Sequence, residues 1–194
     1  MSKNHYSRML AVGCGLRSSR PAHLRPAYLL ILFLSVTPLL CFGQRPVPLT
    51  SKHDIESARP DVDDVFVTRL PLEDYPRLSK FRRLRAVLLG NGATDAKLQA
   101  VAQLDLTNLV DLNMIAAPQV TDLGISALTN IASLKMIGME GTGITDASCE
   151  VMASRMRLQG VNVANCDGVS KKGINALGSS DTIKELGFSA DNLS

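Results

Sequence analysis

Apolar positions recur along this chain with a spacing of 24 or 25 residues. Five six-residue segments share the pattern L-x-x-L-x-L, in which the first, fourth and sixth positions are apolar. Their leading residues are Leu84, Leu109, Leu134, Leu158 and Ile183. A constant period in this range predicts stacked units of supersecondary structure rather than a core assembled from unrelated segments.

Each period predicts one short strand followed by one short helix. The fourth and sixth positions alternate with outward-facing residues, as expected for a strand with one buried face. A hydroxyl residue then begins each helix, in the pairs Thr94-Asp95, Thr121-Asp122, Thr145-Asp146 and Ser170-Lys171. The hydroxyl can cap free backbone N–H groups, and Asp in the first turn suits the positive end of its helix. One such helix cannot bury its apolar stripe alone, so neighbouring units must stack.

Two regions before Leu84 depart from this pattern. Val62, Val65 and Val67 form a degenerate copy of the strand segment. Pro71 and Pro76 follow it and predict a connection that is looser than an α-helix. Residues 44–61 are polar and contain three prolines, which predicts a linker or an N-terminal edge rather than packed structure.

The repeated units resemble leucine-rich repeats, in particular the cysteine-containing subclass with the form LxxLxLxxCxxITDxGLxxL. The segments VNVANCDGVSKKGINAL (161–177) and IGMEGTGITDASCEVM (137–152) carry the resemblance most clearly. It covers residues 62–194, about five to six units, and implies an α/β solenoid with short parallel strands on a concave side and short helices on a convex side.

The ninth position of each unit is often Asn or Cys in that family. Here the position is occupied by Gly92, Ala117, Thr142, Cys166 and Asp191. Only Cys166 matches, so we expect the family's buried polar ladder to be weak or partly replaced.

The N-terminal 43 residues have the order of a secretory signal peptide. They contain five basic residues and no acidic one, and the apolar run Tyr28–Leu40 precedes Gly43 and a cleavage point before Gln44. The 13-residue run is shorter than the roughly 20 residues that a spanning helix needs. We therefore predict export, with membrane contact only through the leader. Lipidation at Cys41, an uncleaved anchor and an organelle transit peptide are the alternatives.

Charge and histidine content narrow the classes of function. Of the 21 basic residues, five lie in the leader, which leaves 16 against 18 acidic residues. This balance gives no reason to expect nucleic acid, whose binding needs a dense basic face. Beyond the leader the only histidine is His53, so a multi-histidine metal site is excluded and a histidine-dependent triad has one candidate. We predict no catalytic residue, no cofactor and no metal.

Cysteines and a small acidic cluster have simpler interpretations. Cys149 falls on a helix stripe and Cys166 on the ninth position, so both are predicted to be buried packing residues; a disulfide between them and a metal site are alternatives. Asp61, Asp63 and Asp64 lack the ligand order of an EF-hand loop, which favours a solvated edge over a calcium site.

The concave side is the candidate binding surface, because residues between the buried strand positions point there. The outward residues include Asp64, Ala86, Glu185 and the predicted partner-binding set Phe66, Leu88, Asp111, Asn113, Ile115, Met136, Glu140 and Asn162. Four of these form an apolar stripe rimmed by acids, namely Phe66, Leu88, Ile115 and Met136. A group of exposed apolar residues indicates a contact site.

The resemblance and the lack of a catalytic constellation lead to one functional hypothesis. We expect a secreted or extracytoplasmic, non-enzymatic scaffold that binds a protein or peptide on its concave face. An adaptor of an F-box-like ubiquitin ligase and a subunit or assembly factor of an organelle complex are the alternatives. Residues 190–194 stop where a further helix would begin, so self-association through an uncapped C-terminal edge is also considered.

Overall fold

The computed structural model describes residues 45–193, so the predicted leader lies outside the described residues. Seven strands form one sheet in sequential order, and every neighbouring pair is parallel. The strands are β1 (Val47–Pro48), β2 (Asp64–Phe66), β3 (Ala86–Leu88), β4 (Asp111–Asn113), β5 (Met136–Gly138), β6 (Gly160–Asn162) and β7 (Glu185–Gly187).

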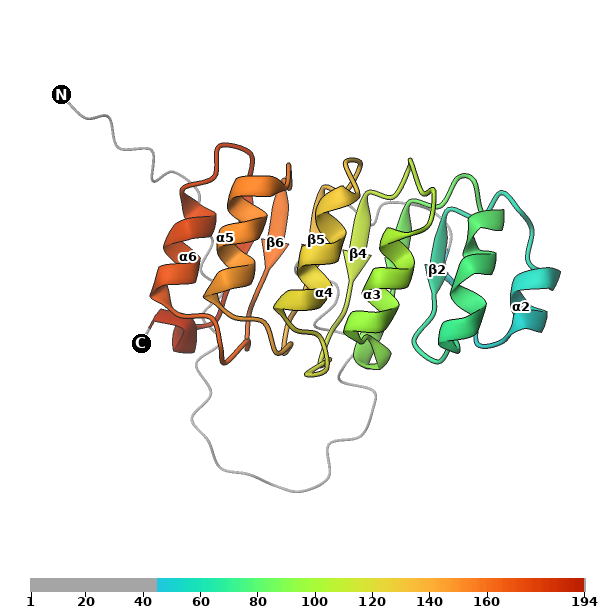
Figure 1. Ribbon diagram of the computed structural model, residues 1–194, viewed down its shortest axis with the longest axis horizontal. Helices are drawn as coiled ribbons and strands as arrows, with labels where there is room; N and C mark the ends of the chain where they lie inside the picture. The colour runs from blue at the N-terminus through green and yellow to red at the C-terminus, as the bar shows by residue number, and fades with distance from the viewer. Residues whose placement is uncertain (1–44, 194) are drawn as a thin grey trace, which may run out of the picture.

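Helices cover one face of this sheet. The α-helices are α2 (Lys52–Ser57), α3 (Asp95–Ala102), α4 (Asp122–Ala127), α5 (Asp146–Arg155) and α6 (Lys171–Gly178), and 3-10 helices are η2 (Leu72–Lys80), η3 (Gly90–Gly92), η4 (Leu128–Asn130) and η5 (Ala190–Leu193). The α-helices lie side by side in chain order (Figure 1). The predicted α/β architecture with a parallel sheet is confirmed.

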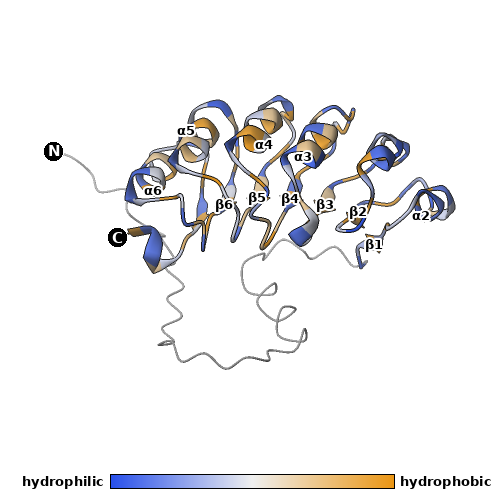
Figure 2. Cartoon of the chain, turned by 60° about the horizontal axis from the view of Figure 1, so that its bottom comes forward, coloured by the Kyte–Doolittle hydropathy of each residue, from blue (hydrophilic) through white to orange (hydrophobic). Residues whose placement is uncertain are grey.

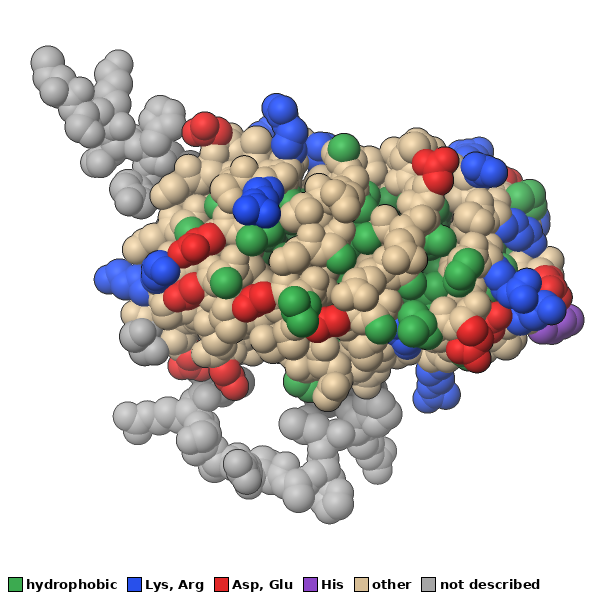
Figure 3. Space-filling view, in the orientation of Figure 1, with side chains coloured by type: hydrophobic (Ala, Val, Ile, Leu, Met, Phe, Trp, Pro, Cys, Tyr) green, Lys and Arg blue, Asp and Glu red, His purple; other side chains and the backbone are tan. Residues whose placement is uncertain are grey.

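The two faces of the sheet differ in character. Figure 2 shows the strands on the inner side of a shallow arc, with the helices outside. On the helix-bearing face, acidic and basic side chains are interspersed (Figure 3). In the described part of the chain, no helix combines the length and apolar character needed to cross a bilayer.

The core lies between the sheet and the helices. The middle residue of each strand points toward the helices, and across β2 to β6 these residues are Val65, Val87, Leu112, Ile137 and Val161, all at most 3% exposed. Leu98, Ile125, Met152 and Ile174 from the helices meet them in the same cluster. The predicted inward alternation of the strands is therefore confirmed.

Residues 47–57 form a strand and a helix at the N-terminal edge of the sheet, which corrects the prediction that 44–61 is a polar linker or an edge without packed structure. Strand β1 pairs with β2, and Leu49 and Ile55 are each only 1% exposed. Ser51 caps α2 by accepting a hydrogen bond from the N–H of Asp54. Pro48 fits because β1 is an edge strand in which the missing N–H costs no ladder bond. Because of its prolines, this strand-and-helix unit was not predicted from the sequence.

The segment after β2 is looser than an α-helix, as predicted. It forms η2, a 3-10 helix with Pro76 inside it. Tyr75 and Leu78 from this segment are fully buried, so it fills the place that α-helices take in later units.

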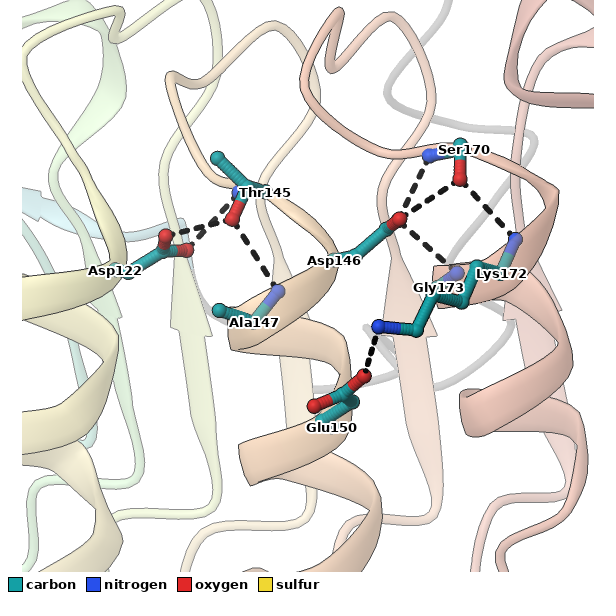
Figure 4. Close-up of polar contacts among 8 residues, drawn as sticks. All are labelled: Asp122, Thr145, Asp146, Ala147, Glu150, Ser170, Lys172 and Gly173. Carbon is teal, nitrogen blue, oxygen red and sulfur yellow. Dashed lines mark hydrogen bonds and ion pairs between the residues drawn. The ribbon is translucent and has the colours of Figure 1, made fainter.

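A ladder of aspartates joins successive helices. The Asp122 carboxylate accepts hydrogen bonds from the Thr145 N–H at 2.9 Å and the Thr145 hydroxyl at 2.7 Å. One unit later, Asp146 accepts from the N–H and hydroxyl of Ser170, at 2.8 and 2.7 Å (Figure 4). Asp95 does the same for Thr121. Each carboxylate thus serves the helix of the next unit.

The ladder extends beyond the capping residues. Asp146 also accepts from the Gly173 N–H at 3.0 Å, inside the first turn of α6. Asp95 reaches the Gly124 N–H in the same way at 3.1 Å. In both places a Cβ on the glycine would collide with the aspartate. Free N–H groups and the positive end of the helix dipole make these helix starts favourable sites for a carboxylate.

Hydrogen bonding holds the pKa of two ladder aspartates below the usual range. Burial by itself raises the pKa of Asp146, but the hydrogen bonds from Ser170 and Gly173 and the nearby Lys172 outweigh it. At Asp122, burial also raises the pKa, but the hydrogen bonds from Ser148 and Thr145 lower it by more, so the net pKa lies below the usual range. These carboxylates stabilise the fold in their ionised form.

We predict that Asp146→Asn lowers the free energy of unfolding by about 1 to 2 kcal/mol at pH 7, because a neutral amide is a weaker acceptor. Since the folded pKa is depressed, the contribution is present above the unfolded pKa and is lost as the pH falls through the folded pKa. Urea unfolding at pH 7 and pH 3 measures this difference. Asp181→Asn, at an exposed position, is the control. Equal losses at both pH values would contradict the ladder.

Candidate functional site

The helix-free face of the sheet is built from the first and third residues of the three-residue strands β2 to β7, together with Pro48 of β1. The register aligns Asp64, Ala86, Asp111, Met136, Gly160 and Glu185 in one row. A second row contains Pro48, Phe66, Leu88, Asn113, Gly138, Asn162 and Gly187. All predicted partner-binding residues that fall within strands therefore belong to these two rows.

Phe66 and Leu88 are direct neighbours in the second row. Phe66 is 42% exposed, while Leu88 is partly buried. The pair forms an apolar surface on β2 and β3 that no described helix covers. An exposed phenyl ring beside an aliphatic side chain is a favourable contact for another apolar group.

The predicted apolar stripe is interrupted. Asn113 follows Leu88 in the second row, and Asp111 separates Ala86 from Met136 in the first. Ile115 lies two residues past the end of β4, where the hydrogen bond from the Ala116 N–H to the Glu140 carbonyl places it beside Glu140. The four apolar side chains therefore form one adjacent pair and two separate positions.

From β4 onward, side chains of the helix-free face lie over glycines. At three places a side chain lies across the glycine of the following strand, where a Cβ would collide with it. The pairs are Met136 over Gly160, Asn113 over Gly138 and Asn162 over Gly187. In the C-terminal half, which is expected to be shallow because of its small residues, these side chains pack closely on bare backbone.

Two carboxylates flank Ala86 in the first row. Asp64 is 7% exposed, and Asp111 is partly buried. Burial and repulsion from Asp63 raise the pKa of Asp64, although Arg85 opposes this. Burial, then repulsion from Asp64, raises the pKa of Asp111 to about 6. Such unfavourable ionisation marks a candidate functional position.

The acidic cluster of Asp61, Asp63 and Asp64 is a solvated edge only in part. Asp61 and Asp63 contact Arg59 and Arg83, at 3.6 and 3.3 Å. Asp64 is buried instead, which corrects the prediction for that residue. Asp64 is the first residue of β2 and pairs with Ala86 of β3, whereas Asp61 and Asp63 precede the strand. Residues 45–193 contain no group of three His, Cys, Asp or Glu side chains placed to hold a metal ion.

Two further polar side chains of the predicted set have distinct environments. The Oδ1 atom of Asn113 is buried and has no hydrogen-bond partner in the described structure. The Glu140 carboxylate accepts a hydrogen bond from Asn165 Nδ2 at 3.0 Å. Asn113 thus adds an unused acceptor next to Leu88, while Glu140 is already engaged.

Both described cysteines are buried free thiols. Burial, together with Asp146, raises the pKa of Cys149 to about 12, and burial also raises the pKa of Cys166. Cys166 donates to the Met139 carbonyl at 3.0 Å. The interpretation as packing residues agrees with this geometry, since a reactive cysteine needs an exposed thiolate. His53 is exposed on α2, away from the strand rows.

The ninth position supplies only part of a polar ladder. The Thr142 hydroxyl donates to the Met139 carbonyl at 2.8 Å, but Asp191 is exposed. Asn192 takes the buried place instead, where its Nδ2 donates to the carbonyls of Cys166 and Val169. A one-residue shift in the last unit accounts for the difference.

The C-terminal edge is partly closed by this Asn192 contact. Strand β7 pairs with β6 alone among the described strands, and η5 packs against α6. Ile183, Leu186 and Phe188 remain partly buried at the edge of the core. Self-association through this edge stays a prediction.

Comparison with models of protein families and with curated proteins finds no match to this chain. The candidate site therefore rests on the geometry of the helix-free face. Sequence reasoning placed Asp64 and Ala86 among the outward residues but left them out of the partner-binding set. Their position beside Asp111 in one row was readable from the repeat register.

We predict that Asp111→Asn is more stable than the wild type by about 1 to 2 kcal/mol above pH 6. An acid whose pKa is raised on folding binds a proton as the chain folds, so its ionisation destabilises the fold as the pH rises from about 4 to about 6. The difference in unfolding free energy should therefore vanish near pH 4. Urea titrations between pH 4 and pH 7 measure it, with the exposed Asp105→Asn as the control. A less stable Asp111→Asn at pH 7 would refute the assignment.

Proposed function

We propose that this chain is an exported, non-enzymatic scaffold of the leucine-rich repeat type that binds a protein or peptide on its helix-free face. The observation that carries the proposal is the Phe66–Leu88 pair, an apolar surface on the inner side of a continuous parallel sheet. Stacked repeats commonly use such extended inner surfaces for binding.

The geometry of the helix-free face supports binding by side-chain contact. The ladder aspartates and the core fix the strands on the opposite side, so the outward residues lie on a preorganised surface. Preorganisation lowers the entropy lost on association. Within residues 45–193, the buried thiols and the one histidine, His53, which is exposed, give no support to a catalytic role.

Phe66→Ser with Leu88→Ser is expected to abolish binding while leaving the fold intact, because both substitutions remove apolar contact area from an exposed or partly exposed surface. The probe is a displayed library of random dodecapeptides selected on the purified protein. Recovery of the enriched peptides should fall at least tenfold on the double variant, with an unchanged circular dichroism spectrum.

Leu72→Ser with Leu123→Ser is the matched control, since these leucines are 42% and 71% exposed but lie outside the strand rows. Equal recovery on both double variants, or loss on the control alone, would show that the helix-free face is not the binding surface.

Export is proposed from the leader alone. If it is cleaved as proposed, N-terminal sequencing of the mature protein should give Gln44 as the first residue in an extracytoplasmic fraction. An intact leader on protein recovered from the cytosol would refute export without affecting the binding surface.

A further inference from the structure

Four basic side chains lie at the edge of the sheet where helices end and strands begin. Arg155 is the last residue of α5, Arg157 follows it, and Lys135 and Lys184 immediately precede β5 and β7. In the loops that lead into β5, β6 and β7, the one acidic residue is Asp181. Figure 3 shows Lys and Arg side chains at the upper edge of the molecule, above α5. We call these four basic residues the basic edge.

The N-terminal end of the sheet holds an ion pair at two equivalent positions. Arg83 lies three residues before β3, and its guanidinium is 3.3 Å from the carboxylate of Asp63, one residue before β2. This pair joins two neighbouring units through opposite charges. Arg157 lies three residues before β6 and Lys135 one residue before β5, so they occupy the same two places in the later units.

The backbone hydrogen bonds support this equivalence. The Asp63 carbonyl accepts hydrogen bonds from two consecutive N–H groups of the next unit, at 2.6 and 3.1 Å. The Lys135 carbonyl accepts in the same way from Gln159 and Gly160, at 2.7 and 3.1 Å. The register therefore places Arg157 beside Lys135, and two cations meet where the earlier units pair a cation with an acid.

None of the four basic-edge side chains forms an ion pair with another described residue. Arg155, Arg157 and Lys184 are exposed, and Lys135 is partly buried. The helix dipole accounts for Arg155, which lies in the last turn of α5. Its effect falls off within that turn, whereas the other three residues lie in loops. Fold stability therefore does not account for the cluster, because neighbouring like charges repel each other.

The surroundings limit what this edge can bind. Asp111 and Glu185, the first residues of β4 and β7, place acids on the adjoining helix-free face, so a long polyanion that continued onto this face would be repelled. The predicted leader has five basic residues and no acidic one, so it has no complementary charge. Lys135 and Lys184 are two strand spacings apart, about 10 Å between their Cα atoms. About three residues of an extended chain span the same distance.

We infer that the basic edge binds a short acidic segment of a partner protein, in which carboxylates about three residues apart contact the Lys135–Arg157 pair and Lys184. The Arg157 guanidinium can hold a carboxylate through two parallel hydrogen bonds, while the lysines act as point charges. Binding relieves the repulsion between Lys135 and Arg157. This surface is separate from Phe66 and Leu88 on β2 and β3, so it goes beyond the proposed function and does not depend on it.

The probe is a fluorescein-labelled peptide of four Glu-Ser-Gly triplets, and its matched control has Gln in place of every Glu. Fluorescence anisotropy with the purified full chain, at about 50 mM NaCl where screening is weak, should show at least tenfold tighter binding of the Glu peptide. Lys135→Gln with Arg157→Gln should weaken that binding at least fivefold. The leader is present in every variant, so differences between variants report on the basic edge.

Arg69→Gln with Lys171→Gln is the matched control variant. It removes the same charge from two exposed residues at the opposite edge, where strands end and helices begin. Its affinity for the Glu peptide should equal that of the wild type. Phe66→Ser with Leu88→Ser should also bind the Glu peptide normally, so failure of this inference is distinguishable from failure of the proposed function.

Three results would overturn the inference. Equal losses on the two charge variants would show that net charge alone attracts the peptide. Tighter binding to a single-stranded oligonucleotide or to phosphatidylserine vesicles, lost in Lys135→Gln with Arg157→Gln, would assign the basic edge to another class of anion. Thermal unfolding of the same variant is expected at or above the wild-type temperature, because it removes repelling charges; a lower temperature would show that the two cations stabilise the fold.

Discussion

The structure depends on one constraint: no unit of this chain can bury its apolar stripe by itself. Each strand has only two or three residues and each helix at most ten. Val87, Leu112 and Ile137 reach near-zero exposure because the strands on both sides and the helices above enclose them. The sheet therefore exists only as a stack, and its register places every outward residue at a fixed spacing.

This constraint also explains the shape of the helix-free face. Strands are spaced about 4.8 Å apart, whereas packed helices need about 8 to 10 Å. Pairing one helix with each strand therefore spreads the outer layer and bends the sheet into the arc of Figure 2. The aspartate ladder, from Asp95 through Asp122 to Asp146, bonds each helix start to the next and so holds the helix layer at a regular spacing.

Periodicity predicted the architecture well and individual contacts less well. The spacing of Leu109, Leu134 and Leu158 was enough to place β4, β5 and β6 side by side. The aspartate ladder was missed because a sequence shows an Asp beside its own helix, while its reach into the next unit is set by stacking. The first unit was missed because Pro46 and Pro48 resemble a linker. The burial of Asp64 likewise depends on neighbouring chain, which no local pattern specifies.

The same residue type serves two opposite energetic roles in this protein. Asp122 and Asp146 accept several hydrogen bonds each, and ionisation of their carboxylates stabilises the fold. Asp64 and Asp111 have no such donors, and their raised pKa values mean that ionisation costs folding free energy. At positions 64 and 111, an uncharged side chain would therefore give a more stable fold. Such a destabilising pair marks a candidate functional position on the helix-free face.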